Sequence, residues 1–459
     1  MNIGIIGSGP AGVSCAIAIC NNLNTDNISI NIYDPGKPFQ GRAFDTDSEA
    51  MLLNTSIAIC YIDPQKPNNF FEYLHKYYNP DLDIGDVVPR YIVRNYFQYE
   101  FNRATQHIKQ ARFIQANVDN VIIDSDNHLY IKVGNAHFGY DAVILATGLK
   151  FKELPQQYQK FNSLKPYPPE QLDAIPPNAS VLILGCHLSA VDTLMHLVAN
   201  KHKGAIGIHA RRPFFPAVRH YIVPTINDAF LQQYRSGIKG LPADNKSRVL
   251  YLIKMLEQYI NQYNISLEAF IPSALIPLDS QLNKEIQLCL SHRNVWEKVL
   301  MDTVDCLNEI WPALSEETKR WFDTKINPWL GRMVHSMPLR NALILRGLFK
   351  TGQLSFIGQQ EMAQITPQSY DYLVNATGLQ SASEDSLIQK MHKNQVIRFN
   401  GSGGLSIDAD THRLNNHSAL YALGSLTQGE IFASNSIFCT ANGAKKIARH
   451  LANIRKPVI

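Results

Sequence analysis

A glycine-rich loop near the start of the sequence, set between two strand-like segments, limits the fold more than any other feature. Residues 3–6 form a short apolar run typical of a buried strand, and the small residues 13–20 predict a helix. A second predicted strand, residues 28–33, ends at Asp34. The loop itself reads Gly7, Ser8, Gly9, Pro10, Ala11 and Gly12. Strand, G-x-G-x-x-G loop, helix, strand and terminal acid in this order predict a dinucleotide-binding β-α-β unit.

The positions of this loop have separate physical roles. Gly7 permits the tight turn, Gly9 lets the backbone approach a pyrophosphate, and Gly12 allows the helix to pack closely on the strand. The helix amino terminus offers free N–H groups and the positive end of its dipole to the phosphates. Asp34 is placed to accept the hydroxyl groups of an adenosine ribose. Pro10, after the second glycine, resembles the loops of FAD-binding proteins and favours FAD over NAD.

Two later segments repeat one pattern, an acid followed by a strand that ends in Ala-Thr-Gly. Residues 141–148 read DAVILATG and residues 371–378 read DYLVNATG. A strand that ends in small residues lets the backbone pass close to a neighbour. These two resemble the crossings between domains in flavoproteins with two dinucleotide-binding domains. Near the end of the chain, residues 420–429 read LYALGSLTQG, a strand that ends at a glycine and a polar residue, and residues 442–448 predict a helix.

A second nucleotide-binding unit is predicted in the middle of the chain. Residues 180–184 form an apolar strand, and a G-x-G-x-x-A variant of the loop follows, from Gly185 to Ala190. His187 stands where the second glycine is expected. Two interpretations remain open. In one, the imidazole turns outward, or even contacts the phosphate, and NADPH binds; in the other, the site is degraded and binds no nicotinamide.

The strand after this loop favours NADPH over NADH. Residues 206–209 lead directly to Arg211 and Arg212, where a dinucleotide-binding unit specific for NAD has an acid. Arginine at this place suits the 2′-phosphate of NADPH. Two solvated surface arginines would give the same sequence, so this alternative stays open.

Composition excludes several other classes of protein. Over 459 residues the net charge is only +4, so neither a nucleic-acid nor a membrane partner is expected. No uncharged apolar run reaches the roughly 18 residues of a transmembrane helix. The seven cysteines form no C-x-x-C pair, and the histidines show no metal-binding spacing. We therefore expect buried free thiols in a reducing cytoplasm and no metal site.

With these motifs, the chain resembles the FAD-NAD(P)-binding oxidoreductase family, which is related to flavin-dependent N-hydroxylating monooxygenases such as the ornithine and lysine N-hydroxylases. The similarity runs nearly end to end. Its elements are GRAF at 41–44, LLN at 52–54, FFEYL at 70–74, PRY at 89–91, the loop at 185–192, WEKV at 296–299, RMVH at 332–335 and LGSLTQG at 423–429. Residues 430–440, EIFASNSIFCT, depart from the family pattern. That stretch is expected near the flavin and the substrate.

The resemblance implies which residues hold the two cofactors. FAD is expected to contact Gly7, Ser8, Gly9, Pro10, Ala11, Gly12, Asp34, Arg42, Asn54, Thr147, Gly148, Gly424, Ser425 and Thr427. NADPH is expected to contact Gly185, His187, Ser189, Ala190, Arg211 and Arg212. Asn54 is placed by the isoalloxazine ring, and Gly424 and Ser425 by the ribityl phosphate, with Ser425 in place of a more usual Asp. Arg42 either contacts an FAD phosphate or is a surface charge.

Other site residues are weaker candidates. Arg332 and His335 are placed at the cleft by the resemblance and are, with Asn54, the catalytic candidates; an interdomain salt bridge is the alternative for the first two. His220 and Tyr221 follow the second nucleotide-binding unit and are candidates for a gate over it.

The fold expected is α/β, a flavoprotein with two dinucleotide-binding domains. Its FAD domain is Rossmann-like and of the glutathione-reductase type, and it is split between residues 1–165 and 350–459. An NAD(P)-binding unit occupies 176–225, and a mainly helical insert occupies 226–349. Apolar residues recur at helical spacing in this insert, which predicts that they form its core.

The function implied by the resemblance is NADPH-dependent N-hydroxylation of a small amine or amino acid by O₂, through a flavin C4a-hydroperoxide. Such a reaction needs a neutral amine held close to the flavin, without covalent catalysis by the protein. Two alternatives remain. One is a flavin reductase or dehydrogenase without a stable peroxide, and the other is a non-catalytic FAD-bound sensor with a degraded nicotinamide site.

Overall fold

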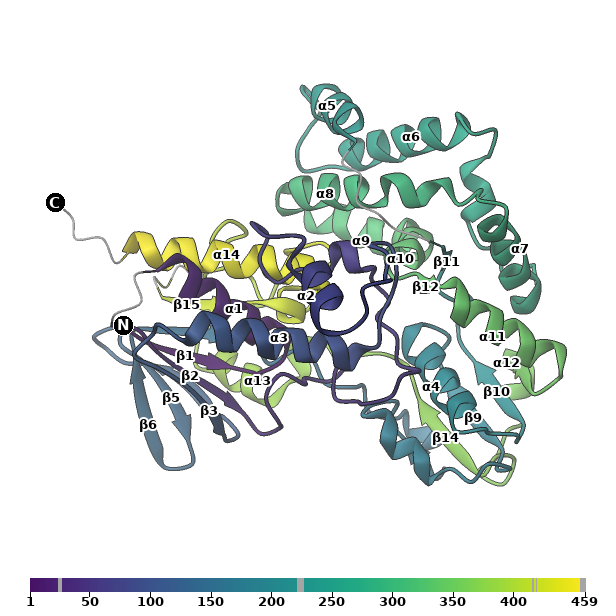
Figure 1. Cartoon of the computed structure of the whole chain (residues 1–459), viewed down its shortest axis with the longest axis horizontal. Coiled ribbons are helices and arrows are strands. Elements are labelled where there is room, and N and C mark those ends of the chain that lie inside the picture. Colours follow the sequence, from purple (N-terminus) through teal and green to yellow (C-terminus); the bar gives the residue numbers. More distant parts are fainter. Residues whose placement is uncertain (24–26, 221–226, 415–416, 418, 455–459) are drawn as a thin grey trace.

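The computed structural model of the chain describes residues 1–23, 27–220, 227–414, 417 and 419–454. Figure 1 shows three parts: a first α/β unit near both ends of the chain, a second α/β unit from its middle, and a group of helices beside the two. Parallel sheets form the centre of both α/β units. The predicted fold class, an α/β protein with two parallel-sheet units and a mainly helical insert, is confirmed.

The first unit is built on a parallel sheet with the strand order β15-β7-β1-β2-β3. The strands are β1 Asn2–Ile6, β2 Ser29–Asp34, β3 Gln110–Gln115, β7 Ala142–Leu145 and β15 Leu420–Ala422. One face packs against helices α1 Pro10–Asn22, α3 Arg90–Thr105 and α14 Ile437–Ile454. The other face meets an antiparallel sheet of β4 Asn120–Ile123, β5 Leu129–Val133 and β6 Ala136–Tyr140. Coverage on both faces explains why β1 and β7 are almost wholly apolar runs.

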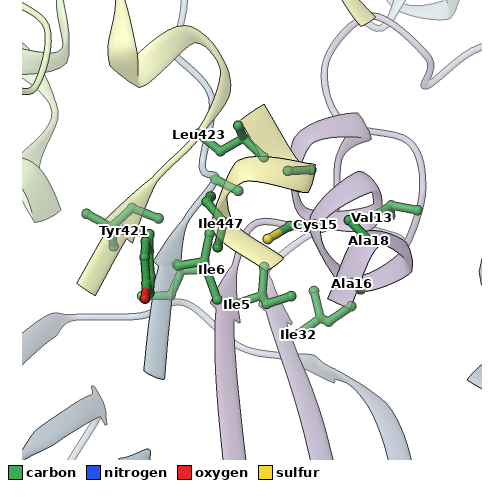
Figure 2. Close-up of a cluster of buried hydrophobic side chains, with 14 of the residues drawn as sticks. Ile5, Ile6, Val13, Cys15, Ala16, Ala18, Ile32, Tyr421, Leu423 and Ile447 are labelled. Atoms are coloured by element: carbon green, nitrogen blue, oxygen red, sulfur yellow. The ribbon is translucent and has the colours of Figure 1, made fainter. Parts of the chain in front are cut away.

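The first helix, α1, brings the two ends of the chain together. Its small residues let it lie close to both the sheet and α14. Figure 2 shows side chains from β1, α1, the segment after β15 and α14 in one buried cluster, among them Ile5, Cys15, Leu423 and Ile447. The glycine-rich loop before α1 and the segment after β15, residues 423–436, are therefore held next to each other. We call residues 423–436 the closing segment.

The second unit has a parallel sheet with the strand order β13-β10-β9-β14-β8. The strands are β8 Ser163–Leu164, β9 Val181–Leu184, β10 Ile206–His209, β13 Leu354–Phe356 and β14 Tyr372–Asn375. Its helices are α4 Leu188–Ala199, α11 Leu339–Lys350 and α12 Gln359–Met362. The strand predicted at residues 206–209 is confirmed as β10.

The sheet pairing differs from the predicted domain boundaries. The sequence assigns residues from 350 onward to the FAD domain and begins the second unit at 176, but β13 pairs with β10, and β14 pairs with both β9 and β8. The second Ala-Thr-Gly strand therefore completes the second sheet, as the first one, β7, completes the first sheet. Parallel strands far apart in sequence leave no local signal of their partner, so the sequence could not place them. The chain crosses between the units after β7 and again after β14.

The helical insert shares its core with the first unit. Its helices are α5 Asp228–Gly237, α6 Ser247–Asn261, α7 Leu278–Leu290, α8 Leu300–Ile310, α9 Glu316–Lys325 and α10 Asn327–Val334. Apolar residues predicted to form its core, such as Leu252 and Leu307, are buried, and they pack in one cluster with Phe432 and with Phe438 of α14. A short parallel pair, β11 Val218–Arg219 and β12 Met337–Pro338, joins the start and end of the insert.

Shorter elements complete the chain. They are α2 Asn69–Tyr77, α13 Ser386–Lys393 and the 3₁₀ turns Ile57–Ile59, Gln156–Tyr158, Pro169–Ala174, Leu267–Phe270, Val295–Val299, Trp311–Ala313, Ala382–Glu384 and Gly424–Thr427. Within the described ranges, none of the helices combines the length and the apolar character needed to cross a bilayer.

Candidate functional site

The first glycine-rich loop contains two backbone contacts that leave no room for a side chain. Gly7 has a φ of 110°, and a Cβ there would lie 2.2 Å from the carbonyl oxygen of Ala146. A Cβ on Gly12 would lie 1.9 Å from the carbonyl oxygen of Gly7. Gly9 lies against Gly41, because a Cβ on Gly9 would lie only 3.3 Å from the Gly41 Cα. The close approach predicted for a strand ending in Ala-Thr-Gly is therefore the approach of Ala146 to Gly7.

A cavity of about 210 Å³ opens beside this loop. Gly7, Asp34 and Thr147 line it together with residues 116–119 and the start of α13. The Asp34 carboxylate accepts the backbone N–H of Ser8 at 2.7 Å and that of Gly36 at 2.8 Å, which fixes it at the end of β2. A fixed carboxylate on the wall of a cavity of this kind suits the ribose of a nucleoside.

The closing segment lies at the amino terminus of α1. Gly424 has a φ of 74°, and a Cβ there would lie 3.1 Å from the Ala11 Cβ, which follows Pro10 in the first turn of the helix. Thr427 is buried and donates its hydroxyl to the Gly424 carbonyl oxygen at 2.9 Å. Ser425 is partly exposed. The structure thus brings the first loop and the 424–427 turn together, as a shared cofactor site requires.

Arg42 lies against the first crossing rather than free in solvent. Its Nη1 donates to the carbonyl oxygen of Leu149, and its guanidinium carbon lies 5.2 Å from the centroid of the Phe151 ring. Burial lowers the pKa of Arg42 from its ordinary value; Tyr167 opposes this shift and Arg90 adds to it. This environment does not match a simple surface charge. Gly148, just before Leu149, has a φ of 66° at the bend of the crossing.

Asn54 carries a polar atom without a partner. Its Oδ1 is buried and accepts no hydrogen bond from the described residues. The backbone before it is fixed, because Leu53 N–H donates to the Val88 carbonyl at 2.8 Å and Arg90 Nε donates to the Leu52 carbonyl at 3.1 Å. The Ser8 hydroxyl in the first loop is likewise buried, with no partner among the described residues. Such atoms point to a bound ligand or an ordered water.

The second loop repeats the geometry of the first. Gly185 has a φ of 115°, and a Cβ there would lie 2.3 Å from the carbonyl oxygen of Ala376 in the second Ala-Thr-Gly segment. Gly185 N–H donates to the carbonyl oxygen of His209 in the neighbouring strand β10 at 2.7 Å. In the same way, Gly7 N–H donates to the carbonyl oxygen of Tyr33 in β2 at 2.8 Å. Ala190, in the third fingerprint place, is buried in α4, and Ser189 is partly exposed in its first turn.

His187 has the backbone conformation of the glycine it replaces. Its φ and ψ of −88° and −166° match the −71° and −174° of Gly9, and each residue caps its helix without a side-chain hydrogen bond. The residue is exposed, yet the protein around it removes enough solvent to lower the pKa of the imidazole to about 4. Positive charge from Arg332, His335 and Arg212 acts in the same direction. His187 therefore stands neutral at neutral pH, close to the guanidinium groups of Arg332 and Arg212.

The arginines after β10 are held beside the second loop through a thiol. Cys186 Sγ lies 3.1 Å from the carbonyl oxygens of both Arg212 and Phe214, and its one S–H is shared between them. Burial raises the pKa of Cys186 to about 11, so the group remains a thiol. The side chains of Arg211 and Arg212 are exposed, and Arg212 is close enough to lower the pKa of His187.

Arg332 forms a salt bridge within the protein. It is buried, its Nη2 pairs with Glu285 Oε1 of α7, and its Nε donates to the Phe215 carbonyl. This geometry favours the salt-bridge alternative over a catalytic role. The Nη1 of Arg332 and the Oε1 of nearby Gln281 are buried beside a small cavity, with no partners in the part of the chain that the structure describes.

His335 and His220 are both exposed to solvent. His335 is exposed, and partial burial lowers the pKa of its imidazole. His220 is exposed, and its backbone N–H donates to Glu297 Oε1 at 2.8 Å. Tyr221, its predicted partner in a gate, lies outside the described residues. The gate therefore stays a prediction.

Two sets of residues at this site were missed by sequence reasoning. Lys150 and Lys390 border the cavity, where Lys150 Nζ pairs with Asp385 Oδ2 at 2.9 Å. Arg90 pairs with Asp192 at 2.6 Å between the two units. Both members of the second pair lie in quoted motifs, but residues so far apart in sequence give no sign that they meet.

The departing stretch 430–440 packs against the insert. Trp311 Nε1 donates to the Gly429 carbonyl at 2.9 Å, and the Trp311 ring lies 5.2 Å from that of Phe432. Lys319, which is buried, lies 3.6 Å from Glu430. Insert side chains thus decide where this stretch lies.

Comparison with known proteins supports the architecture. Residues 4–150 match a family model described as FAD-NAD(P)-binding. No curated protein sequence matches the chain. Among solved structures, ornithine N-hydroxylase from Kutzneria sp. 744 is similar, with 13% identity, coverage of 99% of each chain and a TM-score of 0.60. The reduced form of ornithine hydroxylase from Pseudomonas aeruginosa has 14% identity, 99% coverage of each chain and a TM-score of 0.60. L-lysine 6-monooxygenase from Pseudomonas syringae has 14% identity, 99% coverage of each chain and a TM-score of 0.55.

Proposed function

We propose that this chain is an FAD-dependent oxidoreductase that takes electrons from NADPH and uses O₂ to N-hydroxylate a small amine or amino acid. The observation that carries the proposal is the pair of matching nucleotide-binding loops, in which Gly7 meets Ala146 and Gly185 meets Ala376. One chain with two such loops is suited to bind a flavin and a nicotinamide together. The named hydroxylases of similar fold supply the reaction class.

The residues of the first unit fit FAD. Asp34 lies at the cavity wall for the adenosine ribose. The amino terminus of α1 has no side-chain cap, so its N–H groups are available to a pyrophosphate. Asn54 Oδ1 and Ser8 Oγ are buried polar atoms without partners in the described chain, and a cofactor with many polar edges would satisfy them. FAD, when bound, supplies the redox chemistry, and the protein supplies binding and orientation.

Other residues of the chain would hold NADPH, exclude water and orient the flavin. The N–H groups at the start of α4 and the side chains of Arg211 and Arg212 would hold the phosphates of NADPH. The aromatic cluster of Trp311, Phe322 and Phe432 is buried between the insert and the closing segment and excludes water from that side. Exclusion of water keeps reduced cofactor from side reactions. Asn54 would orient the reacting ring.

The decisive experiment is a reduction assay on the purified protein. We expect visible absorbance from bound flavin, loss of that absorbance on anaerobic addition of NADPH, and a hydroxylated product when O₂ and an amine such as ornithine or lysine are supplied. Reduction by NADPH with release of peroxide but no hydroxylated amine would favour the reductase alternative. No reduction by NADPH or NADH would contradict the proposal and favour a sensor, the alternative that His187 supports.

Nicotinamide binding should depend on pH through His187. The imidazole titrates near pH 4 in the free protein because of burial and the neighbouring positive charges. A pyrophosphate bound beside it would raise that pKa, so binding takes up a proton and tightens as the pH falls. Between about pH 8 and about pH 5.5, we expect the affinity for NADP⁺ to rise about three- to tenfold more in the native protein than in His187→Gln.

His187→Gly distinguishes the effect of the imidazole's charge on nucleotide binding from the effect of its size. At about pH 8 the imidazole is neutral and only occupies room, so the glycine variant should bind NADP⁺ more tightly than the native protein. Toward acidic pH this advantage should shrink, because protonated His187 attracts the phosphates. Titration calorimetry measures both effects. Equal pH slopes in the native protein and His187→Gln would show that the imidazole does not face the nucleotide.

A further inference from the structure

A buried ionic cluster joins the two nucleotide-binding units. Arg90 begins α3 in the first unit, and Asp192 lies in α4, the helix that starts at the second glycine-rich loop. Arg90 Nη2 lies 2.6 Å from Asp192 Oδ2, and the side chains are only 5% and 3% exposed. Tyr167 donates its hydroxyl to the same carboxylate oxygen and accepts from Arg90 Nη1 at 3.2 Å. One charged pair and one phenol are therefore fully enclosed between the units.

In the first unit, the cluster contacts residues 51–52, just before the Asn54 that is expected to lie beside the flavin. Arg90 Nε donates to the Leu52 carbonyl at 3.1 Å, and its backbone N–H donates to the Met51 carbonyl at 2.9 Å. Leu52 lies two residues before Asn54, whose buried Oδ1 has no partner in the described chain. A displacement of Arg90 would therefore move the backbone that carries Asn54.

In the second unit, the cluster includes a residue of α4, the helix that begins at the second glycine-rich loop, residues 185–190. Asp192 follows His187 by little more than one helical turn, and its carboxylate is buried against Arg90 and Tyr167. A displacement of Asp192 would move the whole of α4 and with it the loop at residues 185–190. Asp192 thus acts on the nucleotide only through the position of its helix.

The cluster lies next to the place where the units are hinged. The two crossing segments run antiparallel, with Lys152 N–H donating to the Gly378 carbonyl at 3.1 Å and Gln380 N–H donating to the Lys150 carbonyl at 2.9 Å. Phe151 of the first crossing stacks on Tyr167, with ring centroids 5.7 Å apart and an interplanar angle of 16°. Besides the crossing segments, Met51 packs in the core of the second unit and Thr46 donates to Glu170 Oε1 at 2.7 Å. The buried ion pair adds the strongest opposition to a change in the relative orientation of the units, because separating it would strand a charge.

We infer that Asp192 is a positioning residue that, through Arg90 and Tyr167, fixes the second nucleotide-binding unit relative to the flavin-facing segment at residues 52–54. This inference rests on the proposed function for its kinetic consequence, since hydride transfer needs the nicotinamide close to the flavin. Its geometric consequence, a single fixed orientation of the two units, is independent of that function.

The test variant is Asp192→Asn, and Glu100→Gln is its matched control. The control removes another buried carboxylate, one that pairs with Arg103 at 2.6 Å in α3 and does not touch the second unit. In Asp192→Asn we expect anaerobic flavin reduction at saturating NADPH to slow at least about tenfold, with the dissociation constant for NADP⁺ changed less than about threefold. Glu100→Gln should change neither value more than about twofold.

A distance measurement gives the second readout. The native cysteines are all buried, so spin labels on Asn135→Cys and Lys350→Cys, one exposed site in each unit, report selectively on inter-unit geometry. We expect a narrow distance distribution in the otherwise native protein and in Glu100→Gln, and a broad or two-peaked one in Asp192→Asn. Tyr167→Phe, which loses only a hydroxyl, should broaden it partly and serves as the test if Asp192→Asn does not fold.

The outcomes separate the two proposals. A narrow distribution in Asp192→Asn, or in Tyr167→Phe where that is the test, overturns the positioning inference even if NADPH reduces the flavin. A native protein that NADPH does not reduce contradicts the proposed function, while the distance distributions still decide whether Asp192 fixes the units. Slower reduction with an unchanged distance distribution also counts against the inference.

Discussion

Gly7→Ala should prevent FAD binding, whereas Gly185→Ala should leave FAD bound and prevent NADPH binding. Each methyl group would be placed against a backbone carbonyl, 2.2 Å from that of Ala146 in the first case and 2.3 Å from that of Ala376 in the second. Neither carbonyl can move alone, because each directly follows a strand that is paired on both sides within its sheet. Each position also has a φ above 100°, where a side chain is strained.

The expected effect is a loss of affinity of at least about 100-fold for the cofactor of the altered loop, or about 2.7 kcal/mol. Gly7→Ala should be purified without visible flavin absorbance and should recover little on incubation with FAD. Gly185→Ala should keep its flavin and accept electrons from dithionite, yet resist reduction by NADPH at concentrations that reduce the native protein. Absorbance and NADP⁺ calorimetry measure the two halves of this result.

Gly134→Ala is the matched control for backbone strain. Gly134 has a φ of 57° in the turn between β5 and β6, and a Cβ there would meet no atom within 4 Å. It should cost about 1 kcal/mol of folding stability and leave both cofactors bound. If Gly185→Ala also loses FAD, the two loops are not independent sites, and the assignment of one cofactor to each loop is wrong.

Features that depend on a few adjacent residues could be predicted from the sequence. The G-x-G-x-x-G loop, the strand at 206–209 and the two Ala-Thr-Gly segments are local features whose backbone requirements are written in a few residues, and each lies where it was predicted. The partner strands of β14 were not predictable, because parallel pairing depends on residues hundreds of positions apart. The domain boundary near residue 350 was wrong for that reason.

The side-chain partners of the site residues could not be predicted from the sequence either. The sequence offered Arg332 as a candidate for the cleft, but nothing in it shows that Glu285 lies beside it, or that Asp192 lies beside Arg90. Ion pairs of this kind have no spacing rule outside a single helix. His187 was visible as a departure from the fingerprint, but its nearness to Arg332 and Arg212 was not.

Arg332→Met should destabilise the fold strongly while leaving cofactor reduction intact in the folded protein. The Arg332 side chain is 3% exposed and its partner Glu285 is 13% exposed, so removal of the guanidinium leaves a nearly buried carboxylate without its counter-charge. We expect a loss of about 3 kcal/mol in the free energy of unfolding by urea. Arg235→Gln is the control, since the Arg235–Glu309 pair is about half exposed and solvent screening should leave the stability almost unchanged when it is lost.

The double variant decides whether the loss comes from the ion pair itself. In Arg332→Met with Glu285→Gln, the buried charge is gone, and the amide oxygen of residue 285 can still accept the Val218 N–H that Glu285 now holds at 2.9 Å. The double variant should therefore be more stable than the sum of the single losses predicts, by about 1–3 kcal/mol. If instead Arg332→Met unfolds like the native protein but its flavin is no longer reduced by NADPH, then the guanidinium acts on the nicotinamide beside His187, and the salt-bridge role is the wrong one.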